Sequence, residues 1–254
     1  MDINSDILIS ERTENRLIKL DKHANFIKGS DSFSQLSNSC GITTNCLNQI
    51  FVTDAKFNLI LKFNSDFNLV QTVGSFLGSP KFGKLNYPWG ITAESGANPD
   101  HFVYVCDYKN SRCIKLTYDL QPCDIYAMEK EQKPRRVQVK NDCVYLLHKT
   151  DSHIFISVFD KNSCELLRLV KQFETNVKSF FIDDLLNIFT IGQLSNSTDQ
   201  TQHLNCYNKY NQLMFRTLLL TENKVWDFCF KQLEENDELR LYGASSEGLY
   251  TFEF

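Results

Sequence analysis

The chain has 254 residues, which is long enough for one large β domain or two smaller ones, and its hydrophobic fraction of 42% is adequate for a core and argues against disorder. A net charge of −4 excludes a surface that is basic throughout, as expected of proteins that coat nucleic acid, although a local basic patch stays open. No run of about 18 apolar residues predicts a membrane span, and residues 1–20 lack the basic flank and apolar core of a secretory signal.

The cysteines indicate the compartment. There are nine, an odd number, and no C-x-x-C pair occurs among them. This pattern predicts a reducing, cytoplasmic environment with neither a disulfide framework nor a zinc site.

Short β-rich runs alternate with polar turns along the whole chain, and one frame recurs. A β-rich run ends at a reference position, and a second run closes about nine residues later, or further on where the turn is longer. The reference positions are Glu11, Asp54, Asp107, His148, Gly192 and Gly243. Their spacing of 41 to 53 residues is the length of a four-stranded propeller blade.

Residues 88–116 hold the clearest copy of this repeat. It opens with P-x-G-I at Pro88–Ile91 and continues with D-x-x-N-x-R at Asp107, Asn110 and Arg112. This order resembles one repeat of the NHL class of β-propellers.

Six copies predict an all-β, six-bladed β-propeller in a single domain. The chain starts on a second strand and stops on a third, so the first and last blades are expected to be incomplete. A five-bladed ring and a fragment of a longer chain stay open as alternatives. The predicted blades are residues 1–31, 32–79, 80–128, 129–172, 173–221 and 222–254.

The polar residues in the turns of the repeat have both a structural and a functional interpretation. Acid, amide and guanidinium groups close together on a turn could form a site, but Asp and Asn also shape turns through backbone hydrogen bonds. Because the pattern repeats, we favour a blade-building role. The residues concerned are Asp107, Asn110, Arg112, Glu11, Arg16 and Asp54.

Three lysines occupy the same slot of successive repeats, eight residues after the reference position: Lys19, Lys62 and Lys115. They could form a basic stripe for a partner. We favour the simpler interpretation, a solvated face that also protects sheet edges from pairing with other strands.

The best local charge signal is a basic segment, residues 130–136, between the predicted third and fourth blades. Its cations could contact phosphates or an acidic partner, and nearby aromatic side chains could offer stacking surfaces. The candidate partner-binding or RNA-binding residues are Lys130, Lys133, Arg135, Arg136, Tyr87, Trp89 and Tyr126. Glu129 and Glu131 weaken the case for RNA.

The sequence offers little evidence for a catalytic site. Some six-bladed propellers are metal-dependent hydrolases or lyases that hold a metal with inward-facing His or carboxylate groups. Here His148 and His153 flank a turn, and no metal-ligand pattern recurs at the strand entries. We therefore expect no catalytic residues, metal, cofactor or small-molecule substrate.

The NHL resemblance implies a surface that binds partners. Many proteins of this class carry a RING that gives ubiquitin-ligase activity, but this sequence has no RING cysteine pattern. The first hypothesis is a non-enzymatic scaffold that binds a protein, which could be the recognition part of a ligase. RNA binding is the alternative, and a metal-dependent enzyme is third.

Overall fold

The computed structural model describes residues 6–74, 82–94, 101–173, 175–194, 201–219, 225–232, 239–245 and 249–253. In these ranges nearly all regular structure is β-strand, and the one helical element is a 3-10 turn, η1 (Tyr108–Asn110). The chain divides into two compact units. The first holds residues 1–150 and 158–167, and the second holds residues 151–157 and 168–254.

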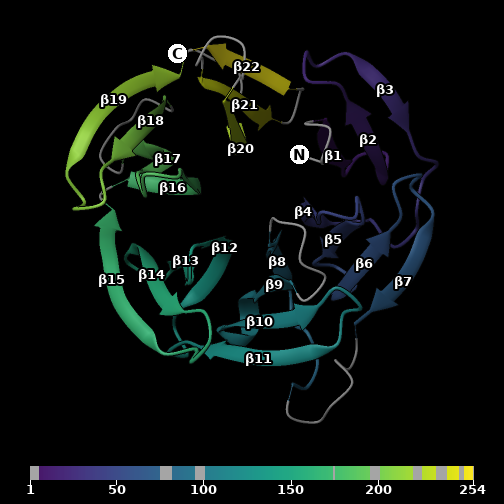
Figure 1. Cartoon of the computed structure of the whole chain (residues 1–254), viewed down its shortest axis with the longest axis horizontal. Coiled ribbons are helices and arrows are strands. Elements are labelled where there is room, and N and C mark those ends of the chain that lie inside the picture. The colour runs from purple at the N-terminus through teal and green to yellow at the C-terminus, as the bar shows by residue number, and fades with distance from the viewer. Residues whose placement is uncertain are drawn as a thin grey trace. The chain divides into compact units, whose positions relative to one another are not determined.

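The first three sheets belong to the first unit, and each runs antiparallel in chain order (Figure 1). The first sheet has the strands β1 (Ile7–Glu11), β2 (Arg16–Leu20) and β3 (Phe26–Gly29). The second has β4 (Ser39–Thr44), β5 (Ile50–Asp54), β6 (Leu59–Phe63) and β7 (Leu69–Val73). The third has β8 (Pro88–Ala93), β9 (Phe102–Asp107), β10 (Arg112–Thr117) and β11 (Pro122–Ala127).

The boundary between the units runs through the fourth sheet, and the remaining two sheets belong to the second unit. The fourth sheet has β12 (Lys133–Lys140), β13 (Cys143–Lys149), β14 (Ile154–Asp160) and β15 (Leu166–Phe173). The fifth has β16 (Thr175–Ile182), β17 (Ile188–Leu194), β18 (Gln202–Tyr207) and β19 (Leu213–Leu219). The last has β20 (Val225–Gln232), β21 (Leu239–Ser245) and β22 (Leu249–Glu253).

The prediction of a six-bladed propeller is wrong, and the structure supports five blades. Four of the described sheets have four strands, β4–β7, β8–β11, β12–β15 and β16–β19, and two have three strands, β1–β3 and β20–β22. The sequence count took each of the two incomplete terminal copies as a separate blade. The copy around Gly243 does form the strands β20–β22, although most side chains of this sheet lie outside the described residues. The repeated strand pattern thus predicted the sheets correctly and the number of blades incorrectly.

The central strands are buried on both faces, because alternate side chains point to opposite neighbours. In β5, Phe51 joins a cluster with Val103 and Ile114 of the third sheet. Its neighbour Val52 joins a cluster with Leu17 of the first sheet. Apolar clusters therefore lie between successive sheets of the first unit.

The reference turns of the first three blades each contain a residue in the left-handed backbone region. It lies four residues after the reference position: Asn15 (φ 55°), Asn58 (φ 59°) and Ser111 (φ 52°). Asn tolerates this conformation better than most side chains, which explains why polar residues recur in the turns of the repeat.

Two glycines allow neighbouring first strands to touch. A Cβ on Gly41 of β4 would lie 2.7 Å from the carbonyl oxygen of Trp89 in β8. A Cβ on Gly90 would lie 2.5 Å from the carbonyl oxygen of Arg135 in β12. Only glycine fits such backbone approaches, so the G of the P-x-G-I motif serves packing between blades.

The three lysines in register are mostly buried, which contradicts the solvated face expected for them. The side chains of Lys62 and Lys115 are 5% and 8% exposed, and that of Lys19 is 15% exposed. Lys62 reaches Asp119 of the next blade at 3.0 Å. Each ammonium group pairs with a carboxylate of the chain, and that of Asp119 is itself 84% exposed, so the three lysines form no basic stripe.

Candidate functional site

The D-x-x-N-x-R motif organises a turn. The buried carboxylate of Asp107 accepts hydrogen bonds from Asn110 Nδ2 and Arg112 Nε, both at 2.8 Å, and from the backbone N–H of Asn86 at 2.7 Å. Burial raises the pKa of Asp107, and these donors oppose that shift. Arg112 also donates to the Phe82 carbonyl. All these partners belong to the chain itself.

The equivalent residues of the other copies make similar contacts. Arg16 Nε donates to Glu11 at 2.6 Å. The carboxylate of Asp54 accepts backbone N–H groups, from Asn38 at 2.6 Å and from Phe57 at 2.8 Å. These contacts suit the blade-building role favoured from the sequence.

Three aromatic rings pack together beside this turn, close to the start of β8. Trp89 and Tyr108 have ring centroids 5.1 Å apart, and Tyr87 lies 5.7 Å from Trp89 and 5.9 Å from Tyr108. All three side chains are half-buried. Half-buried aromatic side chains offer contact area to a partner at a small entropic cost.

Two cations cover these rings. The guanidinium carbon of Arg135 lies 5.3 Å from the Trp89 ring and 5.9 Å from the Tyr108 ring. The ammonium of Lys109 lies 4.8 Å from the Tyr87 ring. These distances are in the range of cation–π attraction. We call Tyr87, Trp89, Tyr108, Lys109 and Arg135 the aromatic–arginine cluster.

Backbone bulges place the two central members of the cluster. In β8 the ladder pairs Pro88 with Asp107 and next Ile91 with Val105, so Trp89 has no partner in the register. In β12 it pairs Pro134 with His148 and next Arg136 with Leu147, leaving out Arg135 in the same way. Bulges re-aim side chains and are common beside functional sites.

Close strand contact brings these two bulges together. Gly90 has no side chain, so β8 can approach the backbone of Arg135 and Arg136 in β12. The Trp89 carbonyl also accepts a hydrogen bond from the Thr53 hydroxyl of β5. The P-x-G-I motif therefore sets the spacing that lets Arg135 stack on Trp89.

The predicted candidates have different surroundings. Tyr126 is fully buried, its pKa is raised by burial, and its hydroxyl donates to the Lys161 carbonyl at 2.7 Å.

The lysines of the basic segment differ from each other. The ammonium of Lys133 donates to the Lys130 carbonyl at 2.8 Å and to Ser111 Oγ at 3.0 Å. The side chain of Lys130 is exposed. Only Tyr87, Trp89 and Arg135 of the predicted set join the cluster.

Arg136 was predicted as a contact residue, whereas two members of the cluster were not. Arg136 Nη1 donates to the Arg135 carbonyl at 3.4 Å. Tyr108 and Lys109 were not predicted, although they fill the variable positions of the D-x-x-N motif. An aromatic and a basic residue in this turn could have indicated a binding site. They were passed over because the turn was interpreted as purely structural.

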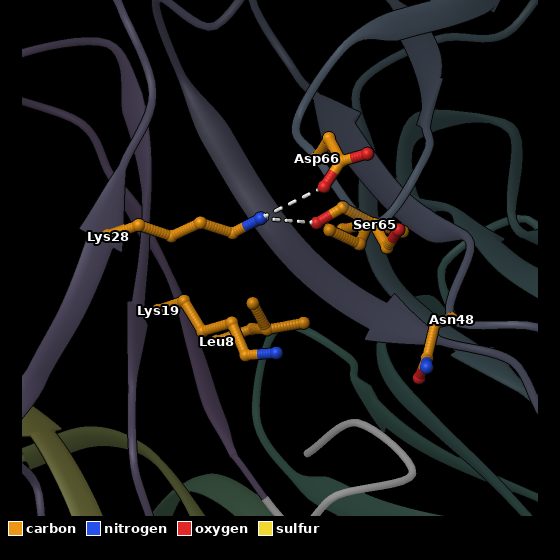
Figure 2. A pocket seen from close by; sticks show the side chains of 7 residues that line it. Leu8, Lys19, Lys28, Asn48, Ser65 and Asp66 are labelled. Atoms are coloured by element: carbon orange, nitrogen blue, oxygen red, sulfur yellow. Dashed lines mark hydrogen bonds and ion pairs between the residues drawn. The ribbon is translucent and has the colours of Figure 1, made fainter.

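A polar pocket of about 250 Å³ lies between the first and second sheets (Figure 2). Its lining residues are Leu8, Lys19, Lys28, Asn48, Ile50, Ser65 and Asp66. Lys28 Nζ donates to the Ser65 carbonyl at 2.7 Å and lies 3.6 Å from Asp66. Lys19 is paired with Asp6 at 2.8 Å. Since both ammonium groups have internal partners, this pocket is a weaker candidate than the cluster.

The histidines named in the sequence analysis differ in exposure. His148 is buried in β13, and burial lowers its pKa to about 4. His153 is exposed and lies 2.6 Å from Ser152 Oγ. Within the described ranges, no three His, Cys, Asp or Glu side chains gather in a way that could hold a metal ion.

Comparison with known proteins shows similarity in structure only. No family model matches the chain, and no curated protein matches it. The WD40 β-propeller domain of Doa1 is similar with a TM-score of 0.65 and 12% identity, over 98% of this chain and 74% of that one. The chain has the β-propeller fold.

Two further solved structures agree with this fold. Hydrazine synthase of Kuenenia stuttgartiensis has a TM-score of 0.65 and 10% identity, over 96% of this chain and 75% of that one. BBS1N, solved in complex with ARL6DN, has a TM-score of 0.60 and 10% identity, over 98% of this chain and 74% of that one. These propellers are of several kinds and do not single out the NHL class. At such identities the likeness concerns the fold alone.

In the part of the chain that the structure describes, no helix is long and apolar enough to cross a membrane.

Proposed function

We propose that this chain is a non-enzymatic protein-binding module whose contact surface is the aromatic–arginine cluster. The observation that carries the proposal is the stack of Arg135 on Trp89 and Tyr108, half-buried where two bulged strands meet. Aromatic side chains and arginine are the residues most enriched in the energetic centres of protein interfaces.

The surroundings of the cluster favour a protein over RNA. RNA-binding sites offer open aromatic faces on which bases stack, together with cations that track the phosphates. Here the rings pack on one another and carry Arg135 and Lys109, while the ammonium of Lys133 is held by backbone and hydroxyl groups. The basic segment therefore supplies fewer free groups to a nucleic acid than its sequence suggested.

The proposal keeps two finer expectations from the sequence. The first is a scaffold role of the NHL type, in which the propeller recognises a partner or substrate for a ubiquitin ligase supplied elsewhere. The second is a cytoplasmic location, inferred from the cysteine pattern. Both rest on sequence features, chiefly the repeat at residues 88–116.

Affinity capture from a cell extract tests the proposal. Baits are the wild-type chain, Trp89→Ala, Arg135→Glu and the control Lys56→Glu, whose ammonium lies over the ring of Phe57 on the equivalent turn of another blade. We expect specific proteins to be lost with the two cluster variants and kept with the control. Proteins captured equally by all baits, or RNA lost only with the cluster variants, would contradict it.

A further inference from the structure

The charged groups of the cluster have no carboxylate partner in the described part of the chain. Arg135 Nε is shielded from solvent and has no hydrogen-bond acceptor among the described residues. Nor does any described carboxylate lie within ion-pair distance of Arg135 or Lys109, whereas Arg112, Lys62 and Lys115 each pair with one. Buried donors in native proteins nearly always have an acceptor. The described residues therefore leave this group open to an acceptor from a partner.

The shape of the two cations indicates the class of acceptor. A guanidinium is a planar fork that matches a carboxylate with two parallel hydrogen bonds. Stacking on Trp89 and Tyr108 holds that fork in one orientation, so little freedom is lost when it binds. Lys109 adds a second positive charge on the adjacent ring of Tyr87.

Nearby negative charges do not neutralise this site. Glu129 and Glu131 are exposed in the segment between β11 and β12, and within the described ranges no ion pair joins either of them to Arg135 or Lys109. The carboxylate of Asp107 is already engaged by Arg112 and Asn110.

From this charge complementarity we infer that the cluster binds an acidic segment of a protein partner, with an Asp or Glu carboxylate on the Arg135 guanidinium and a second acidic group near Lys109. This inference rests on the proposed function and names the chemistry of the partner. The half-buried rings supply the apolar contact around the ion pair, which excludes water and strengthens it.

A random peptide library displayed on phage tests the inference even though the natural partner is unidentified. The whole chain is the bait, and a random single-stranded RNA pool is selected in parallel. We expect the enriched peptides to be rich in Asp and Glu. Synthetic copies should bind about tenfold more weakly to Arg135→Gln, through the lost charged hydrogen bonds. Binding to Lys56→Gln should be unchanged.

The outcomes separate this inference from the proposed function. Peptides that depend on Arg135 but lack acidic residues overturn the inference and leave the protein-binding proposal intact. Acidic peptides that bind Arg135→Gln as tightly as wild type also overturn it. Arg135-dependent RNA, with no Arg135-dependent peptide, overturns both. Lys109→Gln provides a second variant should Arg135→Gln fold poorly, as judged by thermal unfolding.

Discussion

At the residue scale, the same ion pair occurs in two repeats with different burial. The carboxylate of Asp107 is fully buried and Arg112 is 15% exposed, whereas Glu11 and Arg16 are 29% and 42% exposed. A buried charge that loses its partner is costly, and an exposed one is solvated by water. The two pairs therefore form a matched comparison inside one molecule.

We expect Arg112→Ala to lower the free energy of unfolding by about 3 kcal/mol, because it leaves the Asp107 carboxylate buried without its cation. Arg16→Ala is the control and should change stability little. Urea denaturation of both variants measures the difference. Equal losses in the two variants would refute this account of the motif.

His148 should make stability depend on pH. Its pKa is lowered to about 4 by burial, from an ordinary value of 6.5, so between these values the unfolded chain binds more protons than the folded one. The contribution of His148 to the free energy of unfolding is therefore fully present above about pH 6.5. It is lost as the pH drops toward 4, by about 3 kcal/mol in total. Urea denaturation across this range should give a shallower pH dependence for His148→Gln. An identical pH dependence would show that His148 is not its source.

At the scale of elements, the contact between first strands of neighbouring blades holds the candidate site in place. Gly90 removes the side chain that would separate β8 from β12, and the bulges then turn Trp89 and Arg135 toward each other. The geometry of the cluster thus depends on Gly90, which has no side chain and cannot itself contact a ligand through one.

Gly90→Ala should lower the free energy of unfolding by about 2 kcal/mol, because the new methyl group would meet backbone atoms of Arg135 and Arg136 at 2.5 Å and 2.9 Å. Gly29→Ala is the matched control, since its methyl group would find its nearest atom at 3.7 Å. Thermal unfolding compares the two variants. The same loss in both, or none in Gly90→Ala, would count against tight strand packing at this point.

At the scale of the whole molecule, the sequence predicted the repeat well and the number of blades incorrectly. Strand positions followed from alternation and turn residues, which are local signals. The blade count failed because the first and last copies form sheets of only three strands, and a repeated strand pattern does not specify whether such a sheet is a blade of its own.

The candidate site was predicted in part for a similar reason. Trp89 and Arg135 were named from a local basic segment and the aromatic residues near it, but their contact depends on two bulges and a glycine. Tyr126 was named with them and is buried in the core. Spacing along the chain could not tell a strand's inward face from a bulged position.

Photo-crosslinking tests the central claim most directly. A benzoylphenylalanine in place of Tyr108 would sit in the cluster, and one in place of Phe57 would occupy an exposed turn in another blade as the control. The account predicts a protein adduct, sensitive to protease and resistant to ribonuclease, from position 108 and not from position 57. An RNA adduct from position 108, or the same adducts from both positions, would contradict it.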